Sequence, residues 1–241
     1  HADIANLKHQ DVGLGTYDDV GHGTHVAGII AASLGNGKGG AGIAPGVTIL
    51  NIKAGNQDGI PDAYLAKAIK AAADLGADII NMSLGGPFPN ITIRNAVNYA
   101  RDKGVTIVAA MGNDGSTALN YPAAYDGVIG VVSTNSANQR SYFSNYGSWA
   151  DVAAPGSDIF STVPGGYDYM SGTSMATPVV SGVCALYMSA MGHVSPDTME
   201  RVLEKACNKM SGKDVGAGIV DAAKMFDAVV NTPTLIIRNG Y

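Results

Sequence analysis

Apolar residues in this chain form short continuous runs that alternate with longer stretches of mixed character. Runs such as TILNIKA at residues 48–54 and VTIVAAM at residues 105–111 predict strands. The stretch at residues 61–75 predicts a helix, because Pro61 suits a first helical turn and Gly76 suits the position after the last one. The chain therefore alternates strands and helices with short links.

The predicted elements follow one another in an order typical of an α/β fold. We expect strands at residues 48–54, 77–84, 105–111 and 127–133, a further short segment at 151–154, and helices at residues 61–75, 92–103, 174–191, 195 onward and 221–230. Such a β-α-β-α-β order predicts a parallel sheet with right-handed crossovers. Ligand sites in these sheets lie at the carboxyl ends of strands, where Ser83 and Asn113 fall.

Composition supports a sheet that is covered on both faces. Of the 241 residues, 46% are hydrophobic and only 15% are charged, so several elements must be buried on all sides. The net charge of -5 and the lack of a Lys/Arg run argue against nucleic acid as a partner, and no apolar stretch is expected to span a membrane. Cys184 and Cys207 lie on apolar helix faces, which favours buried free thiols over a disulfide.

Ser174 lies in the motif GTSMATP at the start of a predicted helix. A serine hydroxyl becomes a useful nucleophile only when a base removes its proton. A helix start directs backbone N–H groups and the positive end of the helix dipole at an oxyanion, and Gly172 and Ala176 let a substrate carbonyl approach. The simpler interpretation is a serine that caps the helix.

Two histidines, His22 and His25, lie in the motif GHGTHVAGI. A catalytic base must reach the serine and must itself be oriented by a third group. His22 has glycines on both sides and opens the helix predicted by the apolar run that follows. Alternatively, either histidine fills a core or capping position, or the two bind a metal, although the glutamate of an HExxH motif and a third ligand are not evident.

Asn113 ends the predicted strand VTIVAAMGN. A side-chain amide at this place can donate a hydrogen bond to an oxyanion. The other interpretation is a turn asparagine, because the tripeptide NDG is itself a strong turn signal.

Several motifs together indicate a family. HGTHVAG, INMSLGG, AAMGNDG, NYP and GTSMATP occur in the order and close to the spacing of the subtilisin-like serine proteases (subtilases, peptidase S8 type). From about residue 3 to residue 230 the chain resembles their thermitase-like branch. The resemblance implies a three-layer α/β/α fold with a mainly parallel, doubly wound sheet. It also implies a serine endopeptidase that hydrolyses extended polypeptides through an acyl-enzyme, with no cofactor required for the chemistry.

The resemblance assigns roles to the residues singled out above. It implies that Ser174 is the nucleophile, that His22 is the general base, and that the Asn113 side chain and the Ser174 N–H form the oxyanion hole. It implies that residues 83–85 bind the substrate backbone as a strand, with the segment near residues 58–60 on its other side. The residues expected to bind substrate are Ser83, Leu84, Gly85, Ala110, Met111, Gly112 and Asn120.

Three of these expectations concern the pocket for the residue before the cut. Met111 stands where the family usually has alanine, and would narrow or reshape the pocket. Asn120, expected at the pocket floor, is neutral, so no strong charge preference follows. Tyr121–Pro122 matches a family position at which the peptide bond is cis.

The resemblance also implies a structural calcium ion, a location and partners. It places the ion at Asp3 and the loop at residues 34–41, where Asn36 offers a side-chain amide; the alternative is a plain flexible loop. It implies a secreted, extracellular protein whose partners are a polypeptide substrate and a propeptide.

The motifs lack a counterpart of the family's catalytic aspartate. The resemblance puts that residue on a central strand ahead of His1, so we expect an incomplete peptidase domain at residues 1–231 without its first central strand, and an extended tail at residues 232–241 that links to a further domain. The strand would then be deleted, nicked, or on another chain. Asp18 and Asp19 precede His22, but the family often carries polar residues there without a catalytic role.

Two other functions stay open on the sequence. Without the aspartate the imidazole loses its orienter, so activity would fall by orders of magnitude, and a peptide-binding pseudoprotease is the alternative. A lipase or esterase of the α/β-hydrolase class would place its histidine after the serine, where His193 in a polar turn is the candidate.

Overall fold

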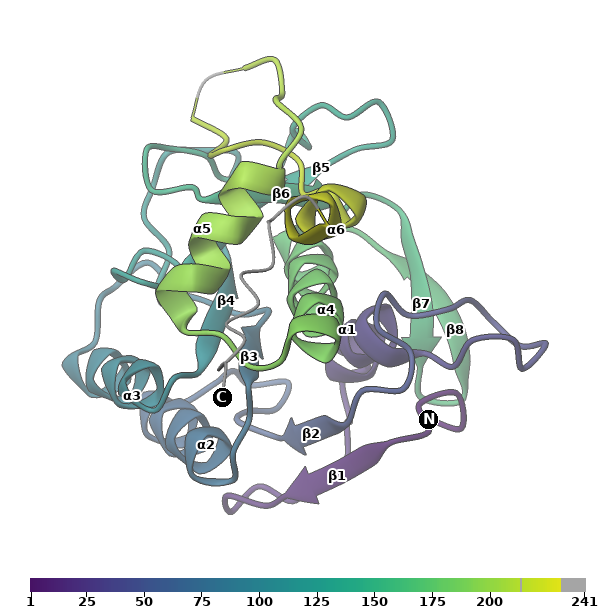
Figure 1. Ribbon diagram of the computed structural model, residues 1–241. Coiled ribbons are helices and arrows are strands. Elements are labelled where there is room, and N and C mark those ends of the chain that lie inside the picture. The colour runs from purple at the N-terminus through teal and green to yellow at the C-terminus, as the bar shows by residue number, and fades with distance from the viewer. Residues whose placement is uncertain (213, 231–241) are drawn as a thin grey trace, which may run out of the picture.

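The structure, a computed structural model, describes residues 1–212 and 214–230 (Figure 1). Its strands are β1 (Leu7–Gln10), β2 (Ile49–Ile52), β3 (Ile79–Met82), β4 (Thr106–Ala110), β5 (Ile129–Thr134), β6 (Val152–Pro155), β7 (Ile159–Val163) and β8 (Gly166–Met170). Its helices are α1 (His22–Ala31), α2 (Asp62–Asp74), α3 (Ile91–Asp102), α4 (Thr173–Met191), α5 (Pro196–Ala206) and α6 (Ala222–Val230). The predicted tail at residues 232–241 lies outside the described residues.

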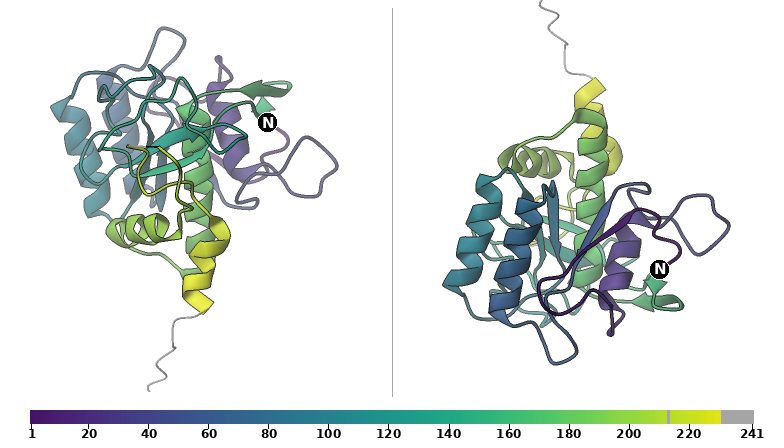
Figure 2. Two further views of the ribbon diagram at one scale, coloured as in Figure 1. Left: turned by 90° about the horizontal axis from the view of Figure 1, so that it is seen from above. Right: turned by 90° about the horizontal axis from the view of Figure 1, so that it is seen from below.

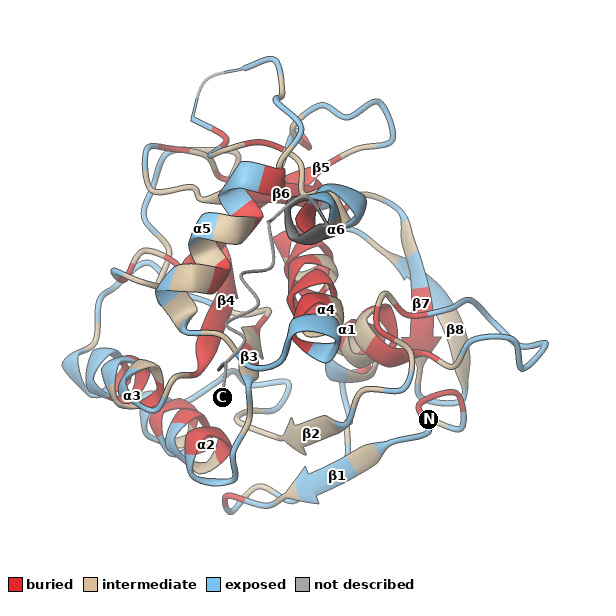
Figure 3. Cartoon of the chain, in the orientation of Figure 1, coloured by how far each residue is buried: buried red, intermediate tan, exposed pale blue. Residues whose placement is uncertain are grey.

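A parallel sheet in the order β3-β4-β5-β6 forms the middle layer. β4 and β5 are buried along their whole length, because alternate side chains enter two different cores. Ile107 and Ala109 pack with residues of α2 and α3, whereas Val108 packs with residues of α4, α5 and α6. Helices therefore cover both faces, which confirms the three-layer α/β/α fold (Figures 2 and 3).

The sheet is interrupted between β2 and β3. β1 and β2 form a separate parallel pair, and among the described residues no strand pairs with the facing edges of β2 and β3. A slot of about 870 Å³ lies between these edges and is also lined by residues of α1, α2 and α4. The interruption falls where the resemblance puts a central strand. β1 itself was not predicted, because its four residues, LKHQ, are half-buried or exposed and carry no apolar alternation.

An antiparallel hairpin of β7 and β8, also not predicted, packs against α1. His25 of α1 is fully buried, and its Nε2 lies 3.0 Å from the Ile159 backbone O and 3.2 Å from the Asp168 backbone O. Helix and hairpin approach so closely at Gly28 that a Cβ there would lie 2.2 Å from the Thr162 Oγ1. His25 is thus a core histidine that joins α1 to the hairpin, one of the alternatives weighed for it.

α4 is the central helix of the fold. It is long and apolar enough to cross a membrane by length and composition alone, contrary to the expectation from the sequence. However, 61% of its most apolar window is buried, and the core helix of an α/β domain passes the same test. Cys184 on α4 and Cys207 after α5 are free thiols, as predicted, and burial raises the pKa of each to about 12.

Candidate active site

Ser174 lies in the first turn of α4, beside the segment that follows β3. Gly172 is the N-cap of this helix, so Ser174 does not have the capping role considered above. The Ser174 Oγ donates to the Ser83 backbone O at 3.1 Å, and the Ser83 Oγ donates to the Ser174 backbone O at 2.7 Å. This reciprocal pair fixes the start of α4 against the carboxyl end of β3.

Asn113 follows β4 and faces the same helix start. Its Oδ1 accepts hydrogen bonds from both the backbone N and the Oγ1 of Thr173, each at 2.9 Å. With the carbonyl side of the amide held in this way, the Nδ2 remains as the donor. A Cβ built on Gly172 would lie 3.5 Å from the Asn113 Nδ2 and 3.5 Å from the Ser174 backbone N, so these two nitrogens border the same space beside Gly172.

An oxyanion hole requires N–H donors that face one space beside the nucleophile. The Ser174 N belongs to the first turn of a helix, where backbone N–H groups lack intrahelical acceptors. Sequence reasoning named Asn113 and Ser174 but missed Thr173, which is fully buried, orients the Asn113 amide, and accepts a hydrogen bond from the Gly112 N at 3.1 Å. The signal for Thr173 was its hydroxyl next to Ser174 in the GTSMATP motif.

His22 is the first residue of α1 and is half-buried. The middle and second half of α1 contact the beginning of α4 in a small apolar cluster formed by Val26, Ile29 and Met175. Burial lowers the pKa of His22 below its ordinary value, although the negative charge of Asp18 opposes this shift. The imidazole is therefore neutral near pH 7, the state in which it can accept a proton.

Asp18 is occupied by local hydrogen bonds. Its Oδ1 accepts from the backbone N of Val20 and of Gly21, and its Oδ2 accepts from the backbone N and the Oγ1 of Thr24. Although burial raises its pKa, these bonds hold the pKa of Asp18 below the usual value. In the part of the chain that the structure describes, no carboxylate lies within 4.0 Å of a His22 nitrogen.

Three of the predicted substrate-binding residues gather around the amide of a fourth, Asn120. The Asn120 Nδ2 donates to the Ala110 backbone O at 2.9 Å. A Cβ on Gly85 would lie 2.1 Å from the same nitrogen, and a Cβ on Gly112 would lie 3.3 Å from the Asn120 Cγ. The amide thus occupies the space between the segments that follow β3 and β4. Tyr121–Pro122, the next bond, is cis as the resemblance implied.

Met111 differs from its expected place. Its side chain is fully buried in the core between the sheet and α3, and it faces Gly130, where an added Cβ would lie 3.5 Å from the Met111 Cγ. A side chain with no exposed surface does not narrow an open pocket. Met111 as a whole residue has no exposed surface, so the structure does not offer it to a substrate. The resemblance gives a residue's position along the strand but not the direction of its side chain.

Asp3 and Asn36, the two residues expected at a calcium site, lie in contact. The Asp3 carboxylate is fully buried and accepts hydrogen bonds from the Asn36 Nδ2 and, at 3.1 Å, from the Tyr167 OH. Both partners are neutral, and among the described residues no Lys, Arg or His pairs with this carboxylate. A buried carboxylate without a compensating cation suits an oxygen-ligated ion such as Ca²⁺.

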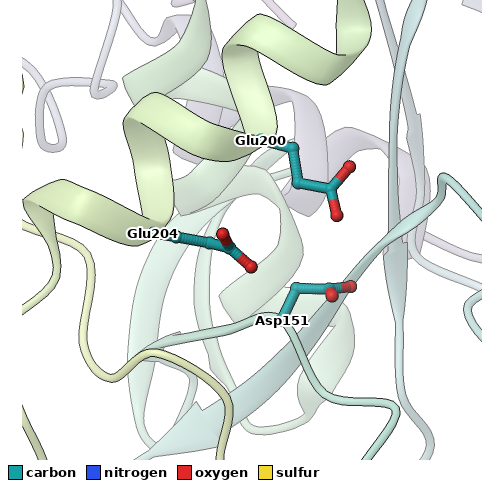
Figure 4. A group of neighbouring side chains, drawn as sticks. All are labelled: Asp151, Glu200 and Glu204. Carbon is teal, nitrogen blue, oxygen red and sulfur yellow. The ribbon is translucent and has the colours of Figure 1, made fainter.

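A second acidic group, which the sequence analysis missed, lies between α5 and the sheet. One oxygen from each of Asp151, Glu200 and Glu204 lies within 4.8 Å of the others (Figure 4). Burial, together with the charges of the two glutamates, raises the pKa of Asp151 to about 7 despite a 2.6 Å hydrogen bond from the Gly130 N. Burial and Glu204 also raise the pKa of Glu200, while Arg101 opposes that shift. Asp151 therefore keeps its proton well above the pH at which an ordinary carboxyl loses it, and releases it as the pH rises through about 7.

This protonation predicts how stability changes with pH. The folded pKa of Asp151 lies above the unfolded value of 3.8, so its contribution to stability is present below about pH 4 and is lost as the pH rises through 7. Asp151→Asn removes this loss. The variant should gain in free energy of unfolding relative to the parent between pH 4 and 8, by about 4 kcal/mol at most, since one pKa unit is worth about 1.4 kcal/mol.

Urea unfolding at several pH values measures this gain. Asp126→Asn, at an exposed position, is the matched control and should show no such trend. A difference between Asp151→Asn and the parent that stays constant from pH 4 to 8 would contradict the raised pKa.

Comparison with known proteins agrees with these motifs. Residues 6–223 match the model of the subtilase family. The chain is 47% identical over 193 residues to a thermophilic serine proteinase of Bacillus sp. (strain AK1), covering 79% of this chain and 48% of that protein. It is also 47% identical over 194 residues to thermitase of Thermoactinomyces vulgaris, covering 80% of this chain and 69% of that protein. The chain thus spans about half the length of the first relative.

Solved structures give the same answer for the fold. A protease from Pseudoalteromonas arctica PAMC 21717 is 37% identical with a TM-score of 0.83, over 86% of this chain and 70% of that one. A mutant of the protease domain of PatA is 31% identical with a TM-score of 0.87, over 94% of this chain and 88% of that one. With motifs, fold and site geometry in agreement, the chain belongs to the subtilase family and is similar to its thermitase-like members.

Proposed function

We propose that the protein is a serine endopeptidase in which Ser174 is the nucleophile and His22 is the general base. Family membership supports the class of enzyme. The observation that carries the assignment to particular residues is that the Asn113 Nδ2 and the Ser174 N border the same space beside Gly172, while the Asn113 Oδ1 is bound by Thr173. A scissile carbonyl oxygen that enters this space would meet both donors as it becomes an oxyanion.

The reaction follows from these placements. The Ser174 Oγ bonds to the scissile carbonyl carbon as its proton passes to His22, and the carbonyl oxygen takes up negative charge between the two donors. His22 then gives the proton to the leaving nitrogen as the C–N bond breaks, which leaves an ester on Ser174. A water molecule then gives a proton to His22 and attacks the ester carbon. The bond to the Ser174 Oγ breaks as the Oγ takes the proton back, and the carboxylic acid is released. In the free protein the Ser174 hydroxyl donates to the Ser83 carbonyl, so it must turn toward His22 before it reacts.

The segment at residues 83–85 favours an extended polypeptide as the substrate. Residues 83–85 lead from β3 to Gly86, whose N and O pair with the backbone O and N of Tyr121 at 2.9 Å and 2.8 Å. This pairing holds residues 83–85 beside the Asn120 amide and Ser174. A peptide that adds to residues 83–85 as a strand brings a carbonyl to the oxyanion donors. The likeness to secreted family members also supports an extracellular location, which detection of the protein in the culture medium of its host would test.

Two variants and one reagent test the catalytic assignment. A fluorophosphonate should form a covalent adduct with Ser174, and Ser174→Ala should abolish both the adduct and peptide hydrolysis. Asn113→Ala should lower kcat by about 10² to 10³ with a small change in KM, a range that comes from another member of this family.

Mass spectrometry of the labelled peptide identifies the modified residue. Asn135→Ala, an asparagine of similar local bonding in the turn after β5, serves as the control and should keep full activity. An adduct on another residue, or none in a folded protein, would favour the non-catalytic peptide-binding alternative.

We also propose that an extended segment occupies the slot between β2 and β3 and brings a carboxylate to His22. The slot has strand edges on both sides and residues of α1, α2 and α4 above and below, the surroundings of a central parallel strand. Gly23, next to His22, and Leu84, next to Ser83, both line it, so it reaches the predicted active site. The His22 imidazole needs such a partner to stabilise its charged form.

Hydrogen exchange in an active preparation tests this proposal. If the slot is filled, every amide of Ile49–Ile52 and Ile79–Met82 should be protected, as the amides of β4 should be. The informative amides are those of β2 and β3 that face the slot and make no hydrogen bond to β1 or β4. If they exchange as fast as exposed backbone while the protein hydrolyses peptides, the slot is empty in the active form and the proposal is wrong.

Finally, we propose that Ca²⁺ binds at Asp3 and Asn36 and stabilises the loop at residues 34–41. The buried, uncompensated Asp3 carboxylate supports it. Chelation should then lower the thermal unfolding midpoint, because an ion that binds only the folded state stabilises it. Asp3→Asn should remove the calcium-dependent part of the midpoint. If Glu204→Gln removes it instead, the ion lies at the second acidic group and the assignment to Asp3 fails.

A further inference from the structure

A second asparagine lies against the loop that carries Asn113. Asn145 is fully buried, and all of its amide is used. The Asn145 Oδ1 accepts from the Asp114 N at 2.9 Å and from the Ser116 N at 3.3 Å. Its Nδ2 donates to the Ala118 backbone O at 3.3 Å and lies 3.5 Å from the Asp114 Oδ2. One side chain therefore binds the loop at three successive points after Asn113.

The backbone of Asn145 binds the loop on the other side of Asn113. The Asn145 N donates to the Gly112 O at 3.0 Å, and the neighbouring residues add bonds from the Gly115 N to the Phe143 O and from the Tyr146 N to the Ser116 O. Gly112 and Asp114 are the residues immediately before and after Asn113. Both are thus held by the same residue, which fixes the path of the chain through Asn113.

We propose that Asn145 is a positioning residue for the oxyanion hole, an inference that rests on the proposed role of Asn113. Thr173 fixes the Asn113 amide from the helix side, and Asn145 fixes the Asn113 backbone from the opposite side. A donor stabilises an oxyanion fully only when it is held in place before the charge develops. Asn145 has no exposed surface, so it acts through the loop that carries Asn113.

Asn145 is itself anchored to the sheet. The Ser144 Oγ donates to the Asn145 O at 3.0 Å and accepts from the Ser133 N of β5 at 2.9 Å. Ser133, Ser144 and Asn145 are all fully buried, so these bonds are shielded from water and hold the segment firmly. Asn113 is therefore held in place by β5, through Ser144 and Asn145, as well as by β4, the strand that it follows.

A double-mutant cycle tests the proposal. Asn145→Ala should lower kcat, and the rate of Ser174 labelling by a fluorophosphonate, by about 10-fold or more with KM within about 2-fold, because a displaced donor loses its effect on the transition state but not on the ground state. In the Asn113→Ala background the same change should cost less than about 2-fold, since the donor it positions is gone.

Asn90→Ala is the matched control. Asn90 accepts from the Thr92 N and the Ile93 N at the start of α3, so it loses the same kind of backbone contacts at a distant site. It should lower stability with kcat unchanged. If Asn145→Ala fails to fold, Asn145→Ser keeps a side-chain acceptor and should show the same non-additivity with a smaller effect.

Each remaining outcome is decisive. Equal losses from Asn145→Ala in both backgrounds, or a comparable loss of kcat in Asn90→Ala, would mean a general loosening of the fold and would overturn the positioning role. If Asn113→Ala alone leaves kcat unchanged, Asn113 is not the oxyanion donor and the proposed function fails at that point. This result comes from the single variant, so it is distinct from a failure of the positioning role of Asn145, which only the double-mutant cycle measures.

Discussion

The contact between the beginning of α4 and the carboxyl ends of β3 and β4 determines the rest of the site. Two short sets of hydrogen bonds make it, Ser83 with Ser174 and Asn113 with Thr173. They hold a helix start, with its free N–H groups, directly over the edge of a buried sheet. The helix and both strands are buried core elements. The Asn113 Nδ2 and the Ser174 N are therefore held as rigidly as the core and more rigidly than a surface loop.

The surroundings of the site use burial in two different ways. At His22 desolvation lowers the pKa and keeps the ring neutral, whereas at Asp151 it raises the pKa and keeps a proton on a carboxyl. Both shifts have one cause, the cost of a charge away from water. The first leaves His22 in the state that the proposed base requires. The second lies beside α5, on the face of the sheet that α4 and α6 also cover, and bears on stability.

The sequence predicted the elements whose pattern is strong. The strands and helices from residue 48 to residue 110, and α4, follow from apolar runs and from helix-boundary residues such as Pro61 and Gly76. β1 was missed because LKHQ carries no apolar alternation, and the β7–β8 hairpin was missed because its strands mix polar and aromatic residues. Asn145 escaped because its function depends on contacts with a loop about thirty residues earlier, in a segment with no regular structure. Met111 was misplaced because family motifs do not say which way a side chain points.

The resting hydrogen bond from the Ser174 Oγ to the Ser83 carbonyl links binding to reactivity. The acceptor belongs to the segment along which an extended peptide would lie. On the proposed binding mode, a peptide paired with this segment would displace the hydrogen bond and free the hydroxyl to turn toward His22. The energy of contacts remote from the scissile bond would then raise the turnover rate rather than tighten binding. Length of substrate, on this account, would be sensed by the nucleophile itself.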